Sequence, residues 1–516
     1  MMTDTAKPDA DARTATRRMP LAWVLVLSLA AGFRFWGLGS KALWLDEVMS
    51  LRLATQPTLA SMLREAASYD NHPPFYALLH FLWLRPVEMR WGPDRVQWGN
   101  NPGLRLDGYA RVPSVLFGLG TVALTLLVAR QLFNQRLALL AGALAAISAF
   151  QVYFSQEARP YALVTLLALG LTCVFLRMLA TPEHVPARLW CAYALLGILL
   201  LYTFVLGLLA IITHALIFAA AGRLSRRNII GGCLASVGMA LAFLPWLPNL
   251  ATAWRLDARL PAVPFNARVS GLVAAFGQWL AGPLDFEPFL LGVSALGLLT
   301  VAFILCRRTT QRAAILGAHI LLPACLYLIV SFGAAWHFQP KHLIFVAPFS
   351  LMLVAGAVGN ARWRGLAVGL VLAVALANLG ELAVYYDTTY EKERWREVAT
   401  YLESREEVGD IILTDPAYVV TPLNYHYRGR MTAWGISADD PRRAVRRIED
   451  ISRVAGVRRA FFVACSSRVA RPRVLTENYF GPAWQPISLR VFDGALGTIT
   501  VTTFVLRPED QNLTLP

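Results

Sequence analysis

The sequence has little charge for its length. Of its 516 residues only 16% are charged, whereas 56% are hydrophobic, and the mean hydropathy is +0.48. A soluble domain usually carries charge on about a quarter of its residues. The shortage of charge therefore excludes a large soluble protein and indicates a membrane protein with many spans.

Cysteine pairs and nucleic-acid motifs are also missing. None of the six cysteines forms a CxxC pair, and five lie in apolar stretches, which excludes a zinc ribbon or a disulfide framework. We find no internal repeats, low-complexity segments or nucleic-acid motif. The formal net charge of +15 would suggest a nucleic-acid partner in a soluble protein, but here much of it lies in short loops between apolar stretches. We expect no nucleic-acid partner.

The N-terminal segment resembles a signal peptide at its start but lacks a cleavage site. Three arginines, the last of them Arg18, precede an apolar run from Leu21 to Phe33. No small-x-small cleavage site follows, and the apolar run continues to Leu38. We interpret the run as a retained first transmembrane helix.

Long apolar stretches fill most of the chain. A membrane span needs about 20 mostly apolar residues. We predict about eleven transmembrane helices, with the stretch 189–221 divided at Tyr202-Thr203. They lie near 20–39, 111–131, 137–154, 160–180, 189–203, 204–221, 229–247, 288–306, 313–332, 343–359 and 365–384.

The arginines favour one topology. If the N-terminus is cytoplasmic, the inner loops carry the basic residues, as the positive-inside rule requires. These residues are Arg130, Arg136, Arg177, Arg188, Arg223, Arg226, Arg227, Arg307, Arg308, Arg312, Arg362 and Arg364. The apolar stretch 74–90 would invert this pattern if it were a span. We therefore predict that it is an amphipathic or re-entrant helix within an outer loop, 40–110.

The character of the chain changes after residue 384. Residues 391–404 have helical periodicity, while 410–415, 459–464 and 497–506 are typical of strands. We predict a polytopic α-helical membrane protein with interfacial helices in its first outer loop and a small soluble α/β domain. Its parts are a cytoplasmic N-terminus (1–19), a transmembrane domain (20–384) and an extracytoplasmic domain (385–516).

Four polar clusters fall on the predicted outer side. The first is Trp44-Leu45-Asp46-Glu47, directly after the first span. Its two carboxylates could merely cap the following helix, because anions are favourable at a helix N-terminus. For this cluster alone we weigh capping and catalysis equally.

The other three clusters combine basic and aromatic side chains. In 70–76, Pro73 and Pro74 are typical of a helix start, but His72 is not explained by that role. In 155–161, Arg159 could pair with Glu157 or hold a phosphate, for which its fork geometry is suited. In 336–342, Lys341 and His342 could belong to an interfacial belt or meet a phosphate. Together the four clusters could supply acid, base and phosphate-binding groups to one site.

Several motifs give the sequence a family resemblance. They are Leu43-Trp44-Leu45-Asp46-Glu47, His72-Pro73-Pro74, Arg111-Val112-Pro113-Ser114, Ser155 to Tyr161, Arg394 to Ala399, and Gly409 to Leu413. In this order, over residues 20 to about 425, the chain resembles the C-type integral-membrane glycosyltransferases. It is most similar to bacterial proteins related to the family 39 protein O-mannosyltransferases and to the lipid A aminoarabinose transferases. Two departures concern the substrate: a long polar segment from Trp91 to Leu106, and Gln339 to His342 where many relatives have an Arg-Tyr pair.

The resemblance implies transfer of a sugar from a polyprenyl-phosphate carrier at the outer membrane face. It implies that Asp46 is the catalytic carboxylate with Glu47 beside it, although local chemistry would allow either. It also implies that Glu157 faces the same cavity, and we add Tyr161 and Asn71 on the acceptor side. An inverting transfer needs one base to take the proton from the acceptor hydroxyl.

The departing phosphate needs positive charge more than it needs a proton donor. The candidates for binding it are Arg159, Lys341, His342, His72 and Arg34. Arg34 has an alternative role, since it lies near a helix end and could extend to the membrane surface.

The resemblance also suggests cofactor, partners and location. Some relatives use a divalent metal near the positions of Asn71, His72 and Glu157. One Glu and one His are a weak ligand set, so we expect no obligatory metal. We expect a monomer in the bacterial inner membrane that binds membrane lipids, a polyprenyl-phosphate-linked sugar, and a glycolipid, polysaccharide or protein acceptor.

Two alternatives lack transfer chemistry. The first is a transporter or lipid-carrier flippase, but such proteins place charge near the bilayer midplane and often contain repeats. The second makes the C-terminal domain a binding module on a membrane anchor. Its arginines could meet an anionic glycolipid or could simply be solvated; they are Arg442, Arg443, Arg446, Arg447, Arg458 and Arg459.

Overall fold

The chain divides into two compact units in the computed structural model. The structure describes residues 10–69, 72–87, 90–91, 96–97, 107–181, 183–257, 263–283, 288–306, 310–331, 338–436, 457–466, 480 and 483–507. The helical unit comprises Met1–Trp36, Leu63–Tyr76 and Arg111–Tyr385. The sheet unit comprises Gly37–Met62, Ala77–Ala110 and Tyr386–Pro516. The ends of the first outer loop are thus grouped with the C-terminal domain.

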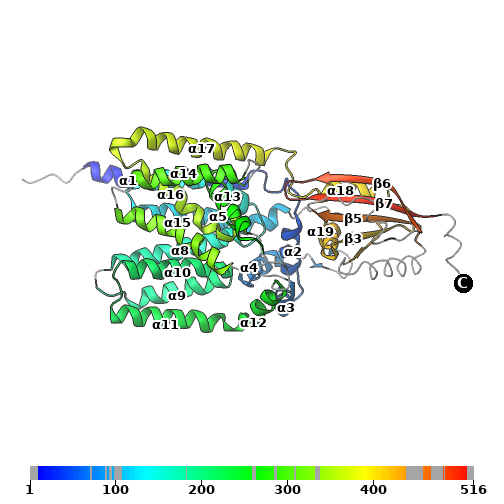
Figure 1. Cartoon of the computed structure of the whole chain (residues 1–516), viewed down its shortest axis with the longest axis horizontal. Coiled ribbons are helices and arrows are strands. Elements are labelled where there is room, and N and C mark those ends of the chain that lie inside the picture. The colour runs from blue at the N-terminus through cyan, green and yellow to red at the C-terminus, as the bar shows by residue number, and fades with distance from the viewer. Residues whose placement is uncertain are drawn as a thin grey trace, which may run out of the picture. The chain divides into compact units, whose positions relative to one another are not determined.

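Long helices lying side by side build the helical unit (Figure 1). They are α1 (Ala10–Phe35), α5 (Asp107–Leu132), α6 (Gln135–Ile147), α7 (Ala149–Ser155), α8 (Tyr161–Ala180), α9 (Ala187–Leu201), α10 (Leu208–Ala220), α11 (Arg226–Phe243), α14 (Pro288–Cys306), α15 (Thr310–Val330), α16 (Ala347–Ala357) and α17 (Arg364–Tyr386). Every predicted span coincides with one of these helices or with a pair of them. The polytopic helical fold is therefore confirmed.

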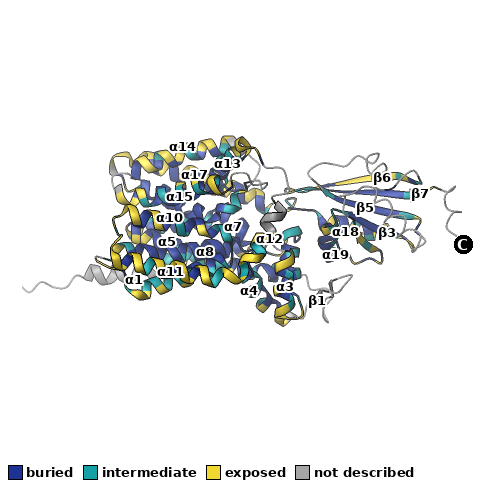
Figure 2. Ribbon diagram, turned by 60° about the horizontal axis from the view of Figure 1, so that its bottom comes forward, coloured by how far each residue is buried: buried dark blue, intermediate teal, exposed yellow. Residues whose placement is uncertain are grey.

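Helix length separates strong spans from weak ones. Among the described residues, six helices are long and apolar enough to cross a membrane, and the bent pair α6–α7 makes a seventh. Four further predicted spans are shorter apolar helices within α1, α9, α10 and α14. Figure 2 shows exposed positions along the outer helices, and on α11 they include Leu234 and Leu241. Apolar side chains with no protein neighbour suit a lipid-facing surface.

Two helices of the helical unit were not predicted. Helices α12 (Leu247–Asp257) and α13 (Phe265–Ala281) lie within 248–287, which the sequence analysis assigned to an outer loop. Polar residues such as Arg268 and Gln278 interrupt the apolar pattern of α13. Helix α13 nevertheless buries Trp279 completely, so packing outweighs its weak sequence signal.

Short helices fill residues 40–110, the segment predicted to be the first outer loop. They are α2 (Leu45–Ala54), α3 (Leu59–Tyr69), α4 (Phe75–Leu84) and the 3-10 turn η1 (Arg85–Val87), followed by strands β1 (Arg90–Trp91) and β2 (Val96–Gln97). A helix of ten residues is about 15 Å long, half the thickness of the hydrocarbon core. The helix predicted at 74–90 is therefore present as α4, and α4 is too short to span.

A five-stranded sheet forms the C-terminal domain. Its strands are β3 (Ile411–Asp415), β4 (Thr432–Gly435), β5 (Arg459–Ser466), β6 (Trp484–Asp493) and β7 (Thr498–Leu506), in the order β4-β3-β5-β7-β6. Strands β3, β4 and β5 are parallel, whereas β7 is antiparallel to β5 and β6. The predicted strands at 410–415, 459–464 and 497–506 are present, while β4 and β6 were not predicted.

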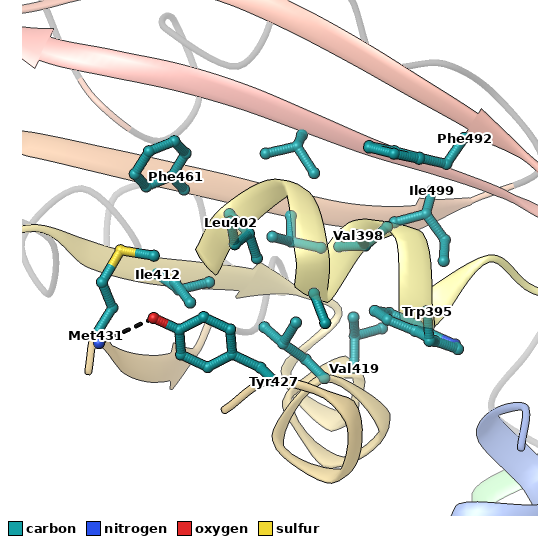
Figure 3. Close-up of a cluster of buried hydrophobic side chains, with 14 residues drawn as sticks. Trp395, Val398, Leu402, Ile412, Val419, Tyr427, Met431, Phe461, Phe492 and Ile499 are labelled. Carbon is teal, nitrogen blue, oxygen red and sulfur yellow. Dashed lines mark hydrogen bonds between the residues drawn. The ribbon is translucent and has the colours of Figure 1, made fainter. Parts of the chain in front are cut away.

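Alternate residues of the strands point to opposite faces of the sheet and pack into two hydrophobic cores. Ile412 and Phe461 face helices α18 (Trp395–Glu403) and α19 (Val420–His426), where Trp395 and Leu402 complete the core (Figure 3). Ile411, Leu413 and Phe462 belong to the opposite face. Strands buried on both faces carry continuous hydrophobic runs, which explains why β3 and β5 were recognisable. The helix predicted at 391–404 corresponds to α18.

Candidate active site

The acidic pair opens helix α2 in the sheet unit. Asp46 and Glu47 occupy the first helical turn, and the residue before the helix, Trp44, provides no side-chain cap. Glu47 is fully buried, whereas Asp46 is only half-buried. The two neighbouring carboxylates thus have different access to a substrate.

The cap of helix α2 comes from the start of the C-terminal domain. The N–H of Leu45 donates to Glu393 Oε2 over 2.9 Å, and the indole N–H of Trp395 donates to the same oxygen over 2.6 Å. Burial raises the pKa of Glu393, and the charge of Asp46 raises it further. A carboxylate at a helix N-terminus satisfies an otherwise unpaired N–H and is favoured by the helix dipole.

Neighbouring residues hold the same two segments together. Glu391 accepts from the N–H of Ala42 (3.1 Å), and the ammonium of Lys41 donates to the carbonyl of Tyr390 (2.9 Å). The half-buried His426 donates from Nε2 to the carbonyl of Leu43 (2.9 Å). We call this set of contacts between residues 41–45 and residues 387–393 with His426 the clasp. It joins the segment before helix α2 to the start of the C-terminal domain, and within it only Glu393 contacts a residue of α2.

The motif Arg394 to Ala399 serves the same connection. The guanidinium of Arg396 pairs with the buried carboxylate of Asp107 and donates to the carbonyl of Ser40. Tyr425 donates to the other oxygen of Asp107 over 2.7 Å. The motif therefore secures both ends of the first outer loop, at Ser40 and at Asp107.

In the helical unit, basic side chains gather around Tyr161. Arg159 Nη2 donates to His72 Nδ1 over 3.3 Å, and Lys341 Nζ lies 5.4 Å from the centre of the Tyr161 ring. His72 meets the same ring edge-on at 6.1 Å. We call His72, Arg159, Lys341 and the adjoining His342 the basic cluster. The structure thus brings together four of the five residues predicted to bind phosphate.

Both histidines of the basic cluster carry their proton on Nε2. A guanidinium only donates, so His72 accepts at Nδ1. His342 accepts at Nδ1 from the backbone N–H of Gln339 (3.3 Å), and the hydroxyl of Tyr327 lies 3.4 Å from the same nitrogen. The cluster therefore combines a guanidinium and an ammonium with two imidazole N–H donors, a set suited to an anion.

Packing contacts hold the segments that carry the basic cluster. Ser114 donates to the carbonyl of Arg159 (3.3 Å) and contacts the hydroxyl of Tyr76 (3.1 Å), which gives the motif Arg111 to Ser114 a structural role. Trp279 of α13 donates to the carbonyl of Pro340 (3.1 Å), next to Lys341 in the turn η5 (Pro340–Val346). The unpredicted helix α13 thus positions a predicted residue.

Glu157 is buried in the turn between α7 and α8, two residues before Arg159. Its neighbour Gln156 donates to the carbonyls of Arg34 (2.9 Å) and Trp36 (2.8 Å) and accepts from Tyr385 (3.0 Å). This turn is therefore tied to the ends of α1 and α17. Asn71 lies outside the described residues.

Arg34 lies at the bend between α6 and α7. Its buried guanidinium donates to the carbonyls of Ala145 (3.1 Å) and Ala146 (2.9 Å) and to the hydroxyl of Ser155 (3.2 Å). The axes of α6 and α7 differ by 57°. A bend leaves carbonyls without helical partners, which is costly in a membrane. These contacts give Arg34 a structural role at the bend.

In the described residues, Glu157 and His72 offer one carboxylate and one imidazole, a weak ligand set for a metal ion. In the described part of the chain no group of three or more His, Cys, Asp or Glu side chains is arranged to hold one. His72 already faces the guanidinium of Arg159, and a further cation beside Arg159 and Lys341 is unfavourable. We derive no step through a metal.

Sequence reasoning missed the clasp. Glu393 and Lys392 directly precede the motif Arg394 to Ala399, and His426 follows a buried strand by eleven residues. Their structural role becomes visible only when they are paired with residues 41–45, and these partners are about 350 residues apart in the sequence. A run of charge at the start of a soluble domain gives no sign of such pairing.

One segment of the chain matches a known family. Residues 107–251 match the model described as dolichyl-phosphate-mannose-protein mannosyltransferase. No curated relative matches the chain.

Two solved enzymes share the fold over most of the chain. One is ArnT from Cupriavidus metallidurans bound to undecaprenyl phosphate, with 14% identity and a TM-score of 0.54 over 93% of this chain and 97% of ArnT. Its apo form gives 16% identity and 0.53 over the same shares. The other is the oligosaccharyltransferase of Archaeoglobus fulgidus in the apo form, with 12% identity and 0.52 over 86% of this chain and 69% of that one. The chain therefore has the fold of these C-type membrane glycosyltransferases, and its segment 107–251 matches a mannosyltransferase family model, in line with the sequence resemblance.

Proposed function

We propose that this enzyme transfers a sugar from a polyprenyl-phosphate carrier to a hydroxyl of an envelope acceptor, with inversion at the anomeric carbon. The observation that carries the proposal is the basic cluster. It concentrates an arginine, a lysine and two imidazole donors around one aromatic ring in a helical membrane unit. Such a set suits a lipid-linked phosphate better than a neutral solute.

The cluster would act on the leaving group. As the bond between the anomeric carbon and the phosphate oxygen breaks, its electron pair leaves with the polyprenyl phosphate. Fixed positive charge stabilises that developing anion. ArnT, which shares this fold, has been solved with undecaprenyl phosphate, and this supports a carrier of the same class here.

Asp46 would act on the acceptor. Its carboxylate takes the hydroxyl proton while the acceptor oxygen forms the new bond to the anomeric carbon, a role worth about 10²–10⁴-fold in rate. Asp46 retains exposed surface, whereas Glu47 is fully buried, which supports Asp46 as the base. Glu157 and Tyr161 would line the acceptor side together with Asn71.

The acceptor is a lipid, polysaccharide or protein of the cell envelope in this proposal. The enzyme would act as a monomer in the bacterial inner membrane, with a cytoplasmic N-terminus and the sheet unit outside. The arginine-rich loops at residues such as Arg226 and Arg227 support this orientation.

Mass spectrometry of envelope glycolipids and glycoproteins tests the proposal. We expect one set of molecules to lose the mass of one sugar when the protein is absent and to regain it when the protein is restored. Identical envelopes in both strains would contradict transfer. A transporter would instead change the distribution of a lipid across the membrane without a new glycosylated product.

A further inference from the structure

We propose that Glu393 is a positioning residue for Asp46, so that the start of the C-terminal domain sets the geometry of the catalytic carboxylate. The inference rests on the proposed function, in which Asp46 is the base. It concerns how one residue at the start of the C-terminal domain acts on a helix turn more than 340 positions earlier in the chain.

The first step is the cap itself. Helix α2 begins without help from its own N-cap residue, since Trp44 makes no side-chain cap. Glu393 accepts the N–H of Leu45, the residue directly before Asp46, over 2.9 Å. The first turn of a helix frays readily when its N–H groups lack acceptors. A capped first turn therefore holds Asp46 in one place.

The second step is the rigidity of Glu393. Its carboxylate also accepts from the buried indole of Trp395, and the side chain is only 5% exposed. The turn between β6 and β7 fixes its backbone, because Ala495 donates to the carbonyl of Glu391 and Leu496 to that of Lys392, each over 2.9 Å. A β-carbon at Gly494 would lie 2.5 Å from the carbonyl oxygen of Lys392 and 3.0 Å from the Cα of Glu393, so only glycine allows this approach. The sheet thus fixes the cap.

The third step is the cost of this arrangement. Burial raises the pKa of Glu393, so its ionised form is disfavoured in the folded protein. A buried glutamine could accept the same N–H without that cost. An ionised acceptor makes the stronger hydrogen bond to a helix N-terminus, which favours precise placement of the turn. A charged residue kept at a cost to stability fits a positioning role in the reaction.

The test compares Glu393→Ala and Glu393→Gln with Glu391→Ala in the full-length protein. Glu391 is a matched control, because it belongs to the same clasp but accepts from Ala42, outside helix α2. We expect Glu393→Ala to lower product formation about 100-fold, as a misplacement of about 1 Å does. Binding of undecaprenyl phosphate, used as the probe, should stay within about twofold, since these contacts do not touch the basic cluster. Glu393→Gln should restore part of the activity.

Amide hydrogen exchange separates positioning from general damage. In Glu393→Ala the amides at the start of α2 should exchange faster, whereas in Glu391→Ala they should exchange as in the wild type. The proposal is overturned if Glu393→Ala loses no more product formation than Glu391→Ala does. It is also overturned if Glu393→Ala loses undecaprenyl phosphate binding as much as it loses product formation. Asp46→Asn is assayed alongside. Full activity of Asp46→Asn refutes the base of the proposed function, whereas an inactive Asp46→Asn with an active Glu393→Ala refutes only the positioning role.

Discussion

Asp46 and Glu47 are neighbours in the sequence, but their surroundings differ. Glu47 is fully buried and close enough to His80 for their charges to interact, while Asp46 keeps exposed surface. We therefore expect Glu47→Gln to retain more activity than Asp46→Asn, which should lose at least about 10²-fold. Product formation by equal amounts of membrane-inserted protein measures this. Equal losses in both variants would leave the base unassigned between them.

The basic cluster makes a separate prediction about binding. Loss of a charged hydrogen-bond partner usually costs about 1.5–3 kcal/mol, or about 10–100-fold in affinity. We expect Arg159→Ala and Lys341→Ala each to weaken undecaprenyl phosphate binding by that amount. Arg312→Ala is the control, because Arg312 is an exposed arginine at the start of α15. If the control weakens binding equally, then general charge and not the cluster attracts the lipid.

At the scale of helices, Arg34 joins α1 to the bend between α6 and α7. Replacing it with Leu would leave the carbonyls of Ala145 and Ala146 without this donor in an apolar surrounding. We expect Arg34→Leu to lower the thermal stability of the detergent-purified protein. Arg159→Ala should lower it less while weakening lipid binding more. If Arg34→Leu instead weakened undecaprenyl phosphate binding without loss of stability, Arg34 would act as the phosphate ligand that its sequence position first suggested.

Helix α19 makes the sheet unit sensitive to acid. Burial lowers the pKa of His426 to about 4, from an ordinary value of 6.5. The unfolded chain therefore binds more protons between these values, and stability falls as pH is lowered from about 6.5 to 4, by up to about 1.4 kcal/mol per pH unit for this group. Chemical unfolding across that range should show a shallower slope for His426→Gln. An unchanged slope would assign the acid sensitivity to other groups.

The elements that were predictable had strong local patterns. Every predicted span is a helix. Strands β3, β5 and β7 lie where continuous or alternating apolar residues predicted strands. Helix α13 and strand β6 were missed because polar residues break their patterns, and tertiary packing decides their structure. The clasp could not be predicted at all, since Glu393 and Leu45 are related only through the fold.

At the scale of the whole molecule, sequence order and spatial grouping differ. The two ends of the first outer loop belong to the same compact unit as the C-terminal domain. The carboxylate proposed as base lies in this sheet unit, whereas the proposed phosphate ligands lie in the helical unit.

Reconstitution in liposomes tests the central claim most directly. The purified protein is incorporated together with a bacterial envelope lipid extract, and mass spectrometry quantifies glycosylated product and free polyprenyl phosphate. If the protein transfers the sugar, the wild type should release one free polyprenyl phosphate for each glycosylated product molecule. The Asp46→Asn variant should form neither free polyprenyl phosphate nor glycosylated product. Product without released polyprenyl phosphate, or equal release by Asp46→Asn, would contradict the account.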